Sequence, residues 1–187
     1  MNTPNDFSPH WHDQPVAVPL QPDEVHAWVL DLDAPVALDE RFLDSAECER
    51  ATRFKVETDR CYFIRRRLVA RGLVAGLLGV SPADLAWTVS LRGRPSVKSV
   101  PFDFNWSHSG NLFLFAATAT GRVGADIERW RAELSRRMEF WNEWTVREAA
   151  AKASGAGIVE PAAGHVPTCR FARHENVGNW TAMIAWL

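Results

Sequence analysis

Residues 112–129 read LFLFAATATGRVGADIER and carry the clearest fold signal in the sequence. An apolar run lies on each side of Gly121, and both runs have the length of a strand rather than of a helix. We predict two strands, Leu112–Thr120 and Arg122–Arg129, that are joined tightly around this glycine. The two strands form the centre of the predicted fold.

Helices and strands are mixed irregularly on both sides of this pair. Residues 25–33, VHAWVLDLD, alternate apolar and polar positions as a half-buried strand does. The other predicted elements are a strand at 86–91, two strands within 169–187, and helical segments at 38–54, 58–78 and 141–154. The order has no regular strand–helix–strand alternation, so we predict an α+β fold.

Composition narrows the class of protein. The 187 residues are 47% hydrophobic and include nine tryptophans, which is enough for a real core in one domain or two small packed halves. The formal charge of −2 gives no reason to expect a nucleic-acid partner. The three cysteines are scattered without zinc spacing, and neither a leader peptide nor a membrane-length apolar run is visible. We therefore expect a soluble, cytoplasmic protein with no membrane partner.

The first 24 residues are rich in Pro, Asp, Asn and Gln and have no periodicity. We predict that residues 1–24 form a flexible arm. The triplet His10-Trp11-His12 lies within it and could bind a metal ion. Solvated histidines are the more common outcome in such a segment.

Two pairs of charged residues are candidates for chemistry. Asp126 and Glu128 are two apart on a predicted strand, so both carboxylates point to one face and could share a Mg²⁺ ion. Glu148 and Lys152 are four apart on a predicted helix and also share a face. The alternatives are a solvated strand face for the first pair and a surface ion pair for the second, and spacing alone leaves both open.

The segment FNWSHSG at 104–110 contains Ser107 next to His108. Adjacent residues on a strand face opposite ways, so a Ser–His nucleophile pair is excluded, and the chain has no GxSxG turn. His108 could instead contact a phosphate, or be a structural histidine. Arginines suited to phosphate occur at 50, 53, 65–67 and 94. Helical spacing allows at most one or two of Arg65–Arg67 to serve the same site.

The order of these motifs is more specific than any one of them. GRP at 93–95, FNWSHSG, GADIE at 124–128 and WTVREAAAKASGAG at 144–157 follow one another, with ERATRF and DR upstream. This order resembles the surfactin-synthetase-type 4′-phosphopantetheinyl transferases. The resemblance covers roughly residues 25–158 and implies a pseudo-dimer of two similar α+β halves, 25–110 and 111–187, with the active site at their junction.

The resemblance also implies an activity. Such an enzyme transfers the phosphopantetheine arm of coenzyme A, its co-substrate, to a serine of an apo acyl or peptidyl carrier protein and releases 3′,5′-ADP. Its pathways are fatty acid, polyketide or nonribosomal peptide biosynthesis, and it is of the holo-acyl-carrier-protein synthase type. A monomer is expected.

The roles that the resemblance implies fall into three groups. The metal ligands for Mg²⁺, or alternatively Mn²⁺, are Asp126, Glu128 and Glu148. The coenzyme A contacts are Arg50, Gly93, Arg94, Pro95, Ser107, His108 and Lys152. Lys152 also neutralises charge on the departing 3′,5′-ADP, and Glu148 or a water molecule accepts the proton of the carrier serine.

The sequence departs from the family pattern in places. Only twenty positions separate Glu128 from Glu148, whereas family members have a longer stretch that helps to receive the carrier protein. Phe63 stands where a smaller residue often lies near the adenine, and arginine replaces lysine at 94 and 147. The alternative function is therefore a degenerate member that binds coenzyme A or a carrier protein without turnover.

Overall fold

The computed structural model describes residues 9–35, 38–90, 94–129, 138–155, 169–174 and 180–187. In chain order its strands are β1 His10–His12, β2 Val25–Asp31, β3 Trp87–Val89, β4 Pro95–Val97, β5 Asp103–Ser109, β6 Leu112–Thr118, β7 Val123–Arg129, β8 Arg170–Arg173 and β9 Trp180–Trp186. Its helices are α1 Ser45–Thr52, α2 Glu57–Leu78 and α3 Met138–Ser154, with short 3₁₀ turns η1 Glu40–Phe42 and η2 Pro82–Asp84. The predicted α+β class is confirmed.

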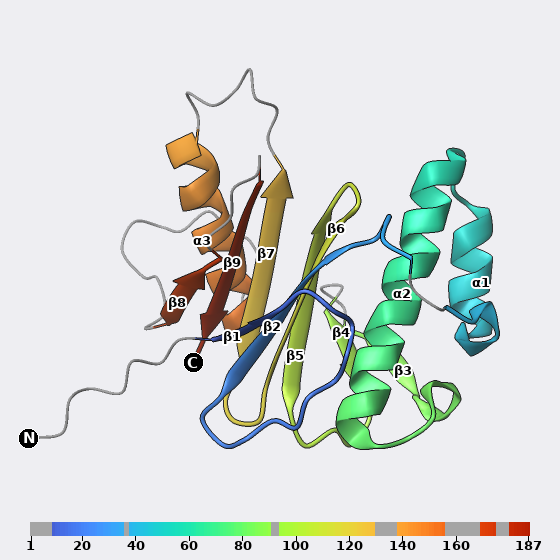
Figure 1. Ribbon diagram of the computed structural model, residues 1–187, viewed down its shortest axis with the longest axis horizontal. Helices are drawn as coiled ribbons and strands as arrows, with labels where there is room; N and C mark the ends of the chain where they lie inside the picture. The colour runs from blue at the N-terminus through green and yellow to red at the C-terminus, as the bar shows by residue number, and fades with distance from the viewer. Residues whose placement is uncertain (1–8, 36–37, 91–93, 130–137, 156–168, 175–179) are drawn as a thin grey trace, which may run out of the picture.

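The strands form two larger sheets and one hairpin. The order β1-β2-β6-β5 makes a four-stranded sheet, β7-β9-β8 makes a three-stranded sheet, and β3 pairs with β4. Figure 1 shows α3 on the outer side of the three-stranded sheet and α2 on the opposite side of the molecule, beside the four-stranded sheet. The molecule is thus layered as helix, sheet, sheet and helix.

The apolar run at residues 112–118 forms the central strand β6. All seven of its residues are buried, because both of its faces are covered. Phe113 and Phe115 pack in the cluster that includes Leu73 of α2. Leu114 and Ala116 face the other way and join the cluster that the three-stranded sheet completes. β6 therefore holds the two halves of the core together.

The helical segments differ in one place from the expectation. α2 ends before Gly79, as predicted. Gly79 has a φ of 67°, and its N–H bonds to the carbonyl of Ala75. Residues 38–54, however, are not one helix. Asp44 caps the start of α1 and forms a capping box with Glu47, so η1 is a separate turn before it.

The predicted arm contains an ordered strand. His10–His12 form β1, which pairs in parallel with β2 from His10 opposite His26 onward. This part of the segment 1–24 is therefore a paired strand and not a loose arm. The boundary expected at residue 110 falls between β5 and β6, which pair in the same sheet. Within the described part of the chain, no helix is long and apolar enough to cross a membrane.

Candidate functional site

Strand β5 separates two groups of side chains. Alternate residues point to opposite sides of a strand, and Asp103, Asn105, Ser107 and Ser109 all bond to β7. Asp103 Oδ2 accepts from the amide of Val123 at 2.8 Å. Ser107 Oγ donates to Asp126 Oδ1 at 3.0 Å, and Ser109 Oγ donates to Glu128 Oε2 at 3.2 Å. The edges of the two larger sheets are thus joined by side chains along the whole of β5.

The acidic group lies between β7 and α3. Asp126 is 3% exposed, and the side chain of Glu148 is 13% exposed. The pKa of Glu128 is raised by burial and then by the charges of Asp126 and Glu148, against the hydrogen bond from Ser109. Burial also raises the pKa of Glu148, against the attraction of Lys152. The structure therefore brings the three predicted acids together, and their charges repel one another.

Lys152 lies in contact with this acidic group. Its Nζ is 2.7 Å from Asp126 Oδ1 and 3.9 Å from Glu148 Oε2. It also donates to Ser107 Oγ at 3.3 Å and to the carbonyl of Ala125 at 3.1 Å. The predicted pair Glu148–Lys152 is consequently not an isolated surface pair, because the ammonium group joins α3 to both β5 and β7.

Gly124 is what allows α3 to come this close. A Cβ on Gly124 would lie 2.0 Å from the carbonyl oxygen of Ala149 and 2.5 Å from the amide nitrogen of Ala153. Both atoms belong to the backbone of α3 and cannot move aside separately. The glycine of the GADIE segment therefore lets the α3 backbone lie against β7, with Glu148 and Lys152 beside Asp126.

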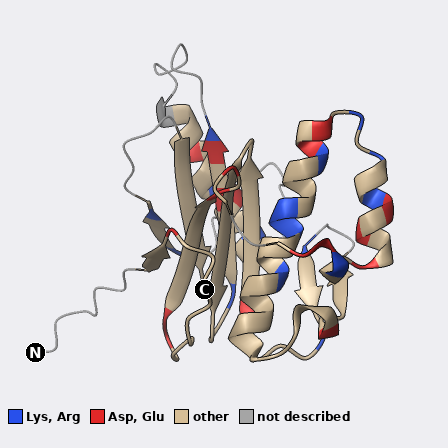
Figure 2. Cartoon of the chain, turned by 45° about the vertical axis from the view of Figure 1, so that its right-hand side comes forward, with Lys and Arg blue, Asp and Glu red and all other residues tan. Residues whose placement is uncertain are grey.

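A basic cleft lies on the other side of β5. It has a volume of about 590 Å³, and α1, α2, β3 and β5 contribute to its walls. The cationic and imidazole groups that line it are Arg50, Arg53, Arg66, Arg67 and His108. Figure 2 shows these helices carrying both blue bands of Lys and Arg and red bands of Asp and Glu, whereas the strands of the larger sheets are mostly uncharged. Of the predicted contacts, Arg50, Pro95 and His108 line this cleft.

The ring of Phe63 contacts three arginines of the cleft. The guanidinium carbons of Arg50, Arg66 and Arg67 lie 5.9, 5.5 and 5.6 Å from its ring centroid, within cation–π range. Burial, with help from Arg67 and Arg50, lowers the pKa of Arg66 to about 10. Burial and the charge of Arg66 also lower the pKa of His108. The four arginines outnumber the three carboxylates that also line the cleft, those of Asp44, Glu47 and Glu49, and this excess of positive charge favours an anionic ligand.

A buried ion network fixes α1 against α2. Arg71 is 2% exposed, and its guanidinium donates to Glu47 Oε2 at 2.9 Å and to Asp44 Oδ2 at 2.8 Å. Glu47 also lies 3.2 Å from Arg67. Because Asp44 and Glu47 form the cap of α1, this network places the Arg50 side of α1 over the cleft.

Arg94 has a different environment from the one expected. Its guanidinium donates to Asp103 Oδ2 at 2.6 Å, to the carbonyl of Val123 at 3.0 Å and to the carbonyl of Lys152. It therefore joins β5, β7 and the end of α3. Its phosphate contact stays a prediction, because these bonds give the guanidinium a structural task. Gly93 lies outside the described residues.

Three arginines that line the cleft, Arg53, Arg66 and Arg67, are absent from the site predicted from the sequence. Arg66 and Arg67 line the cleft, whereas Arg65 donates to the carbonyl of Ala34 at 3.0 Å. This confirms that helical spacing permits at most two of the three arginines in one site. The sequence shows the run Arg65–Arg67, but it does not show which of these arginines enter the cleft. The position of the Phe63 ring, which Arg66 and Arg67 contact, shows this.

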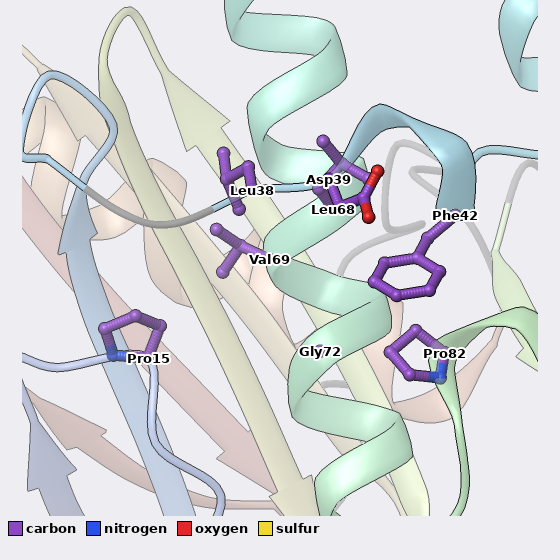
Figure 3. A pocket seen from close by; sticks show the side chains of 8 residues that line it. All are labelled: Pro15, Leu38, Asp39, Phe42, Leu68, Val69, Gly72 and Pro82. Carbon is purple, nitrogen blue, oxygen red and sulfur yellow. The ribbon is translucent and has the colours of Figure 1, made fainter.

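A second hollow of about 360 Å³ lies over the other side of α2. Figure 3 shows it between Pro15, Leu38, Phe42, Val69 and Pro82, with Asp39 at its rim. Its lining is mainly apolar, and the Asp39 carboxylate pairs with Arg41 at 2.7 Å. A hollow without a lining cation is poorly suited to phosphates, so the basic cleft is the better candidate site.

The acidic group suits a hard divalent cation. Asp126 Oδ2 is buried and accepts no hydrogen bond from the described residues. Carboxylate oxygens are preferred ligands of Mg²⁺, and a cation would offset the burial and the repulsion by Asp126 that together raise the pKa of Glu128. The carboxylate set therefore fits such an ion.

These features define an α+β protein that can hold an anionic ligand in a basic cleft beside a group of carboxylates. A family model described as the N-terminal part of 4′-phosphopantetheinyl transferase matches residues 34–120. A protein of Nostoc named 4′-phosphopantetheinyl transferase HetI is 32% identical over 181 residues, a match that covers 80% of this chain and 76% of the relative. A protein of Thraustochytrium named phosphopantetheinyl transferase is 32% identical over 118 residues, covering 58% of this chain and 41% of the relative. The chain therefore belongs to the 4′-phosphopantetheinyl transferase family.

Proposed function

We propose that this protein transfers the 4′-phosphopantetheine arm of coenzyme A to a serine of an acyl or peptidyl carrier protein. The observation that carries the proposal is the alternation of β5. His108 lines the basic cleft, while its neighbour Ser107 bonds to Asp126 in the acidic group. The cleft and the carboxylates therefore lie on opposite faces of a single strand, and we infer that the bound coenzyme extends from one to the other.

The cleft supplies the binding energy for the coenzyme. Arg50, Arg66 and His108 present donors to its phosphates, and guanidinium groups match phosphate oxygens in a bidentate fashion. Burial and the charge of Arg66 lower the pKa of His108, which favours its neutral form and a contact through a ring N–H. The negative charge of the ligand would raise that pKa again.

Asp126, Glu128 and Glu148 would hold Mg²⁺, or Mn²⁺ in its place. The ion, when bound, supplies charge neutralisation for the pyrophosphate. Two of these carboxylates are held in place, because Ser107 donates a hydrogen bond to Asp126 and Ser109 donates one to Glu128. Phosphoryl transfer depends chiefly on such positioning and charge stabilisation.

Two residues of α3 act on the reacting groups. The carrier serine oxygen attacks the β-phosphorus of coenzyme A, and the bond from that phosphorus to the oxygen of the departing 3′,5′-ADP breaks. Glu148 accepts the serine proton, and its raised pKa suits a general base near neutral pH. Lys152 leaves Asp126 to neutralise the departing phosphate.

The two larger sheets, each covered by one long helix, support a pseudo-dimer of similar halves with the site at the β5–β7 edge. The order of motifs supports the surfactin-synthetase-activating type and, in function, the holo-acyl-carrier-protein synthase type. We further propose a cytoplasmic monomer.

One observation favours the alternative, a member that binds coenzyme A or a carrier protein without turnover. The ammonium group of Lys152 already neutralises Asp126 at 2.7 Å, so a metal ion must compete with it. The test is to incubate the protein with coenzyme A, Mg²⁺ and an apo carrier protein and to weigh the carrier. A gain of one phosphopantetheine that EDTA abolishes supports transfer, whereas coenzyme binding without a gain across several carriers supports the alternative.

A further inference from the structure

Four side chains gather at the β1 edge of the four-stranded sheet, away from the basic cleft. His10 and His12 come from β1, His26 comes from β2, and Glu24 precedes β2 directly. The parallel pairing of the strands sets His10 opposite His26, which brings the three imidazoles to one side of the sheet. The centroid of the His26 ring lies 4.8 Å from that of His10 and 5.2 Å from that of His12.

Three of these residues present ligand atoms to a common point. One ligand atom each from His10, Glu24 and His26 lies within 4.8 Å of the other two. The Nε2 atom of His26 is 3.1 Å from Glu24 Oε2, and the Nε2 atom of His10 is 3.7 Å from Glu24 Oε1. Two ligands about 2.0–2.1 Å from a tetrahedral Zn²⁺ ion are about 3.3 Å apart, so both distances to Glu24 already suit such an ion.

His12 is placed to orient the most buried ligand. Its Nε2 lies 3.0 Å from Nδ1 of His26, and the two rings are nearly parallel, at 3°. With a metal ion on Nε2, His26 would carry its proton at Nδ1 and donate it to Nε2 of His12, whereas without the ion its Nε2–H faces Glu24 Oε2 at 3.1 Å. Metal-binding histidines are commonly held in this way by a partner at the second ring nitrogen.

We propose that His10, Glu24 and His26 form a site for a divalent transition-metal ion such as Zn²⁺, with His12 as a positioning residue. Two imidazoles and one carboxylate suit Zn²⁺ and Co²⁺, whereas Mg²⁺ prefers oxygen ligands only. The side chain of His10 is 55% exposed and that of His26 is 7% exposed, so the site is open to solvent on one side. Water completes the coordination there.

The position of the site gives it a structural consequence. The three ligands join β1 to β2, and Trp11 of β1 packs edge-on against His174, which follows β8, at 4.8 Å. An ion bound at this point therefore fixes β1 to the four-stranded sheet. Trp11 of the same strand contacts His174, next to β8 of the three-stranded sheet. We expect Zn²⁺ to raise the melting temperature by favouring the folded state that binds it.

The test is a Zn²⁺ titration of the metal-free full chain by calorimetry, with Co²⁺ absorption as a second measurement. We expect one high-affinity Zn²⁺ site and the visible absorption of tetrahedral Co²⁺ with nitrogen and oxygen ligands. His10→Ala, Glu24→Gln and His26→Gln should each weaken Zn²⁺ binding more than tenfold, and His12→Ala should weaken it by about tenfold. An excess of Mg²⁺ should not displace the Co²⁺ signal.

Asp13→Asn is the matched control, because it removes a neighbouring exposed carboxylate without removing a proposed ligand. Its Zn²⁺ affinity should stay within about threefold of the parent chain. Circular dichroism of each variant without metal shows whether it is folded. The proposal would be overturned if the folded parent chain does not bind Zn²⁺. It would also be overturned if folded His10→Ala and Glu24→Gln bind Zn²⁺ as tightly as the parent chain does.

Discussion

The ammonium group of Lys152 lies 2.7 Å from the carboxylate of Asp126, and this ion pair connects the last turns of α3 to the middle of β7. Asp126 is 3% exposed, so its charge is poorly solvated by water. A cation must neutralise it, and Lys152 does so in the protein without a metal ion. The account therefore requires Lys152 to leave this position, or to share it, when a metal ion and coenzyme A bind.

Replacing Lys152 by alanine tests its part in turnover. We expect kcat to fall by roughly 100-fold or more, because a charge that stabilises the departing group is lost, whereas the affinity for coenzyme A should fall much less. Steady-state kinetics and calorimetry on the same preparation measure the two effects. An unchanged kcat would mean that Lys152 is only the ion-pair partner of its neighbours.

Gly124→Ala tests the close approach of α3. The added Cβ would lie 2.0 Å from the carbonyl oxygen of Ala149, so α3 must move and carry Glu148 with it. We expect the free energy of unfolding to fall by about 1–3 kcal/mol, together with a loss of activity.

Gly72→Ala is the matched control for that change. Gly72 lies within α2, and an added Cβ there meets no atom within 4 Å. Because alanine is the better helix former, we expect Gly72→Ala to stabilise the protein by up to about 1 kcal/mol. Equal denaturation midpoints for the two variants would contradict the packing argument.

Arg94→Ala separates a structural role from a ligand contact. The change removes bonds to Asp103, Val123 and Lys152, and we expect the free energy of unfolding to fall by about 3 kcal/mol. Arg66→Ala should instead lower the coenzyme A affinity by about tenfold with a smaller effect on stability. A stable Arg94→Ala protein with greatly weakened coenzyme binding would show that Arg94 holds phosphate after all.

The raised pKa of Glu128 predicts an unusual pH dependence of stability. A carboxyl group whose pKa is higher in the folded than in the unfolded protein destabilises the fold at pH values above that raised pKa. We therefore expect metal-free Glu128→Gln to have a higher melting temperature than the parent chain at pH 8, and no advantage at a pH well below 4.5, the ordinary pKa of the group. A lower melting temperature at pH 8 would contradict this electrostatic picture.

The sequence predicted most of the secondary structure because its periodicities are strong. The strands around Gly121 and the end of α2 at Gly79 follow from local patterns that the rest of the fold supports. Residues 38–54 misled the helix prediction because the side chain of Asp44 caps a new helix there. The strand β1 was missed because its three residues are held by pairing with β2, which no local pattern records.

The acids of the site could be predicted and their surroundings could not. Spacing marked Asp126 and Glu128 on one predicted strand and Glu148 on one predicted helix as candidates, and the family resemblance assigned all three to one metal ion. The cleft arginines come from two helices, and only the position of Phe63 selects Arg66 and Arg67 from the run. The bonds of Arg94 link three elements far apart in sequence, so its environment was not predictable from the turn that contains it.

A crystal structure of the protein with coenzyme A and Mn²⁺ tests the central claim most directly, because the anomalous signal of manganese locates the ion. The account predicts one peak bound by Asp126, Glu128 and Glu148 and by the pyrophosphate of a coenzyme whose remaining phosphates lie among Arg50, Arg66 and His108. Coenzyme A bound elsewhere, or a manganese peak that touches none of these carboxylates, would contradict it.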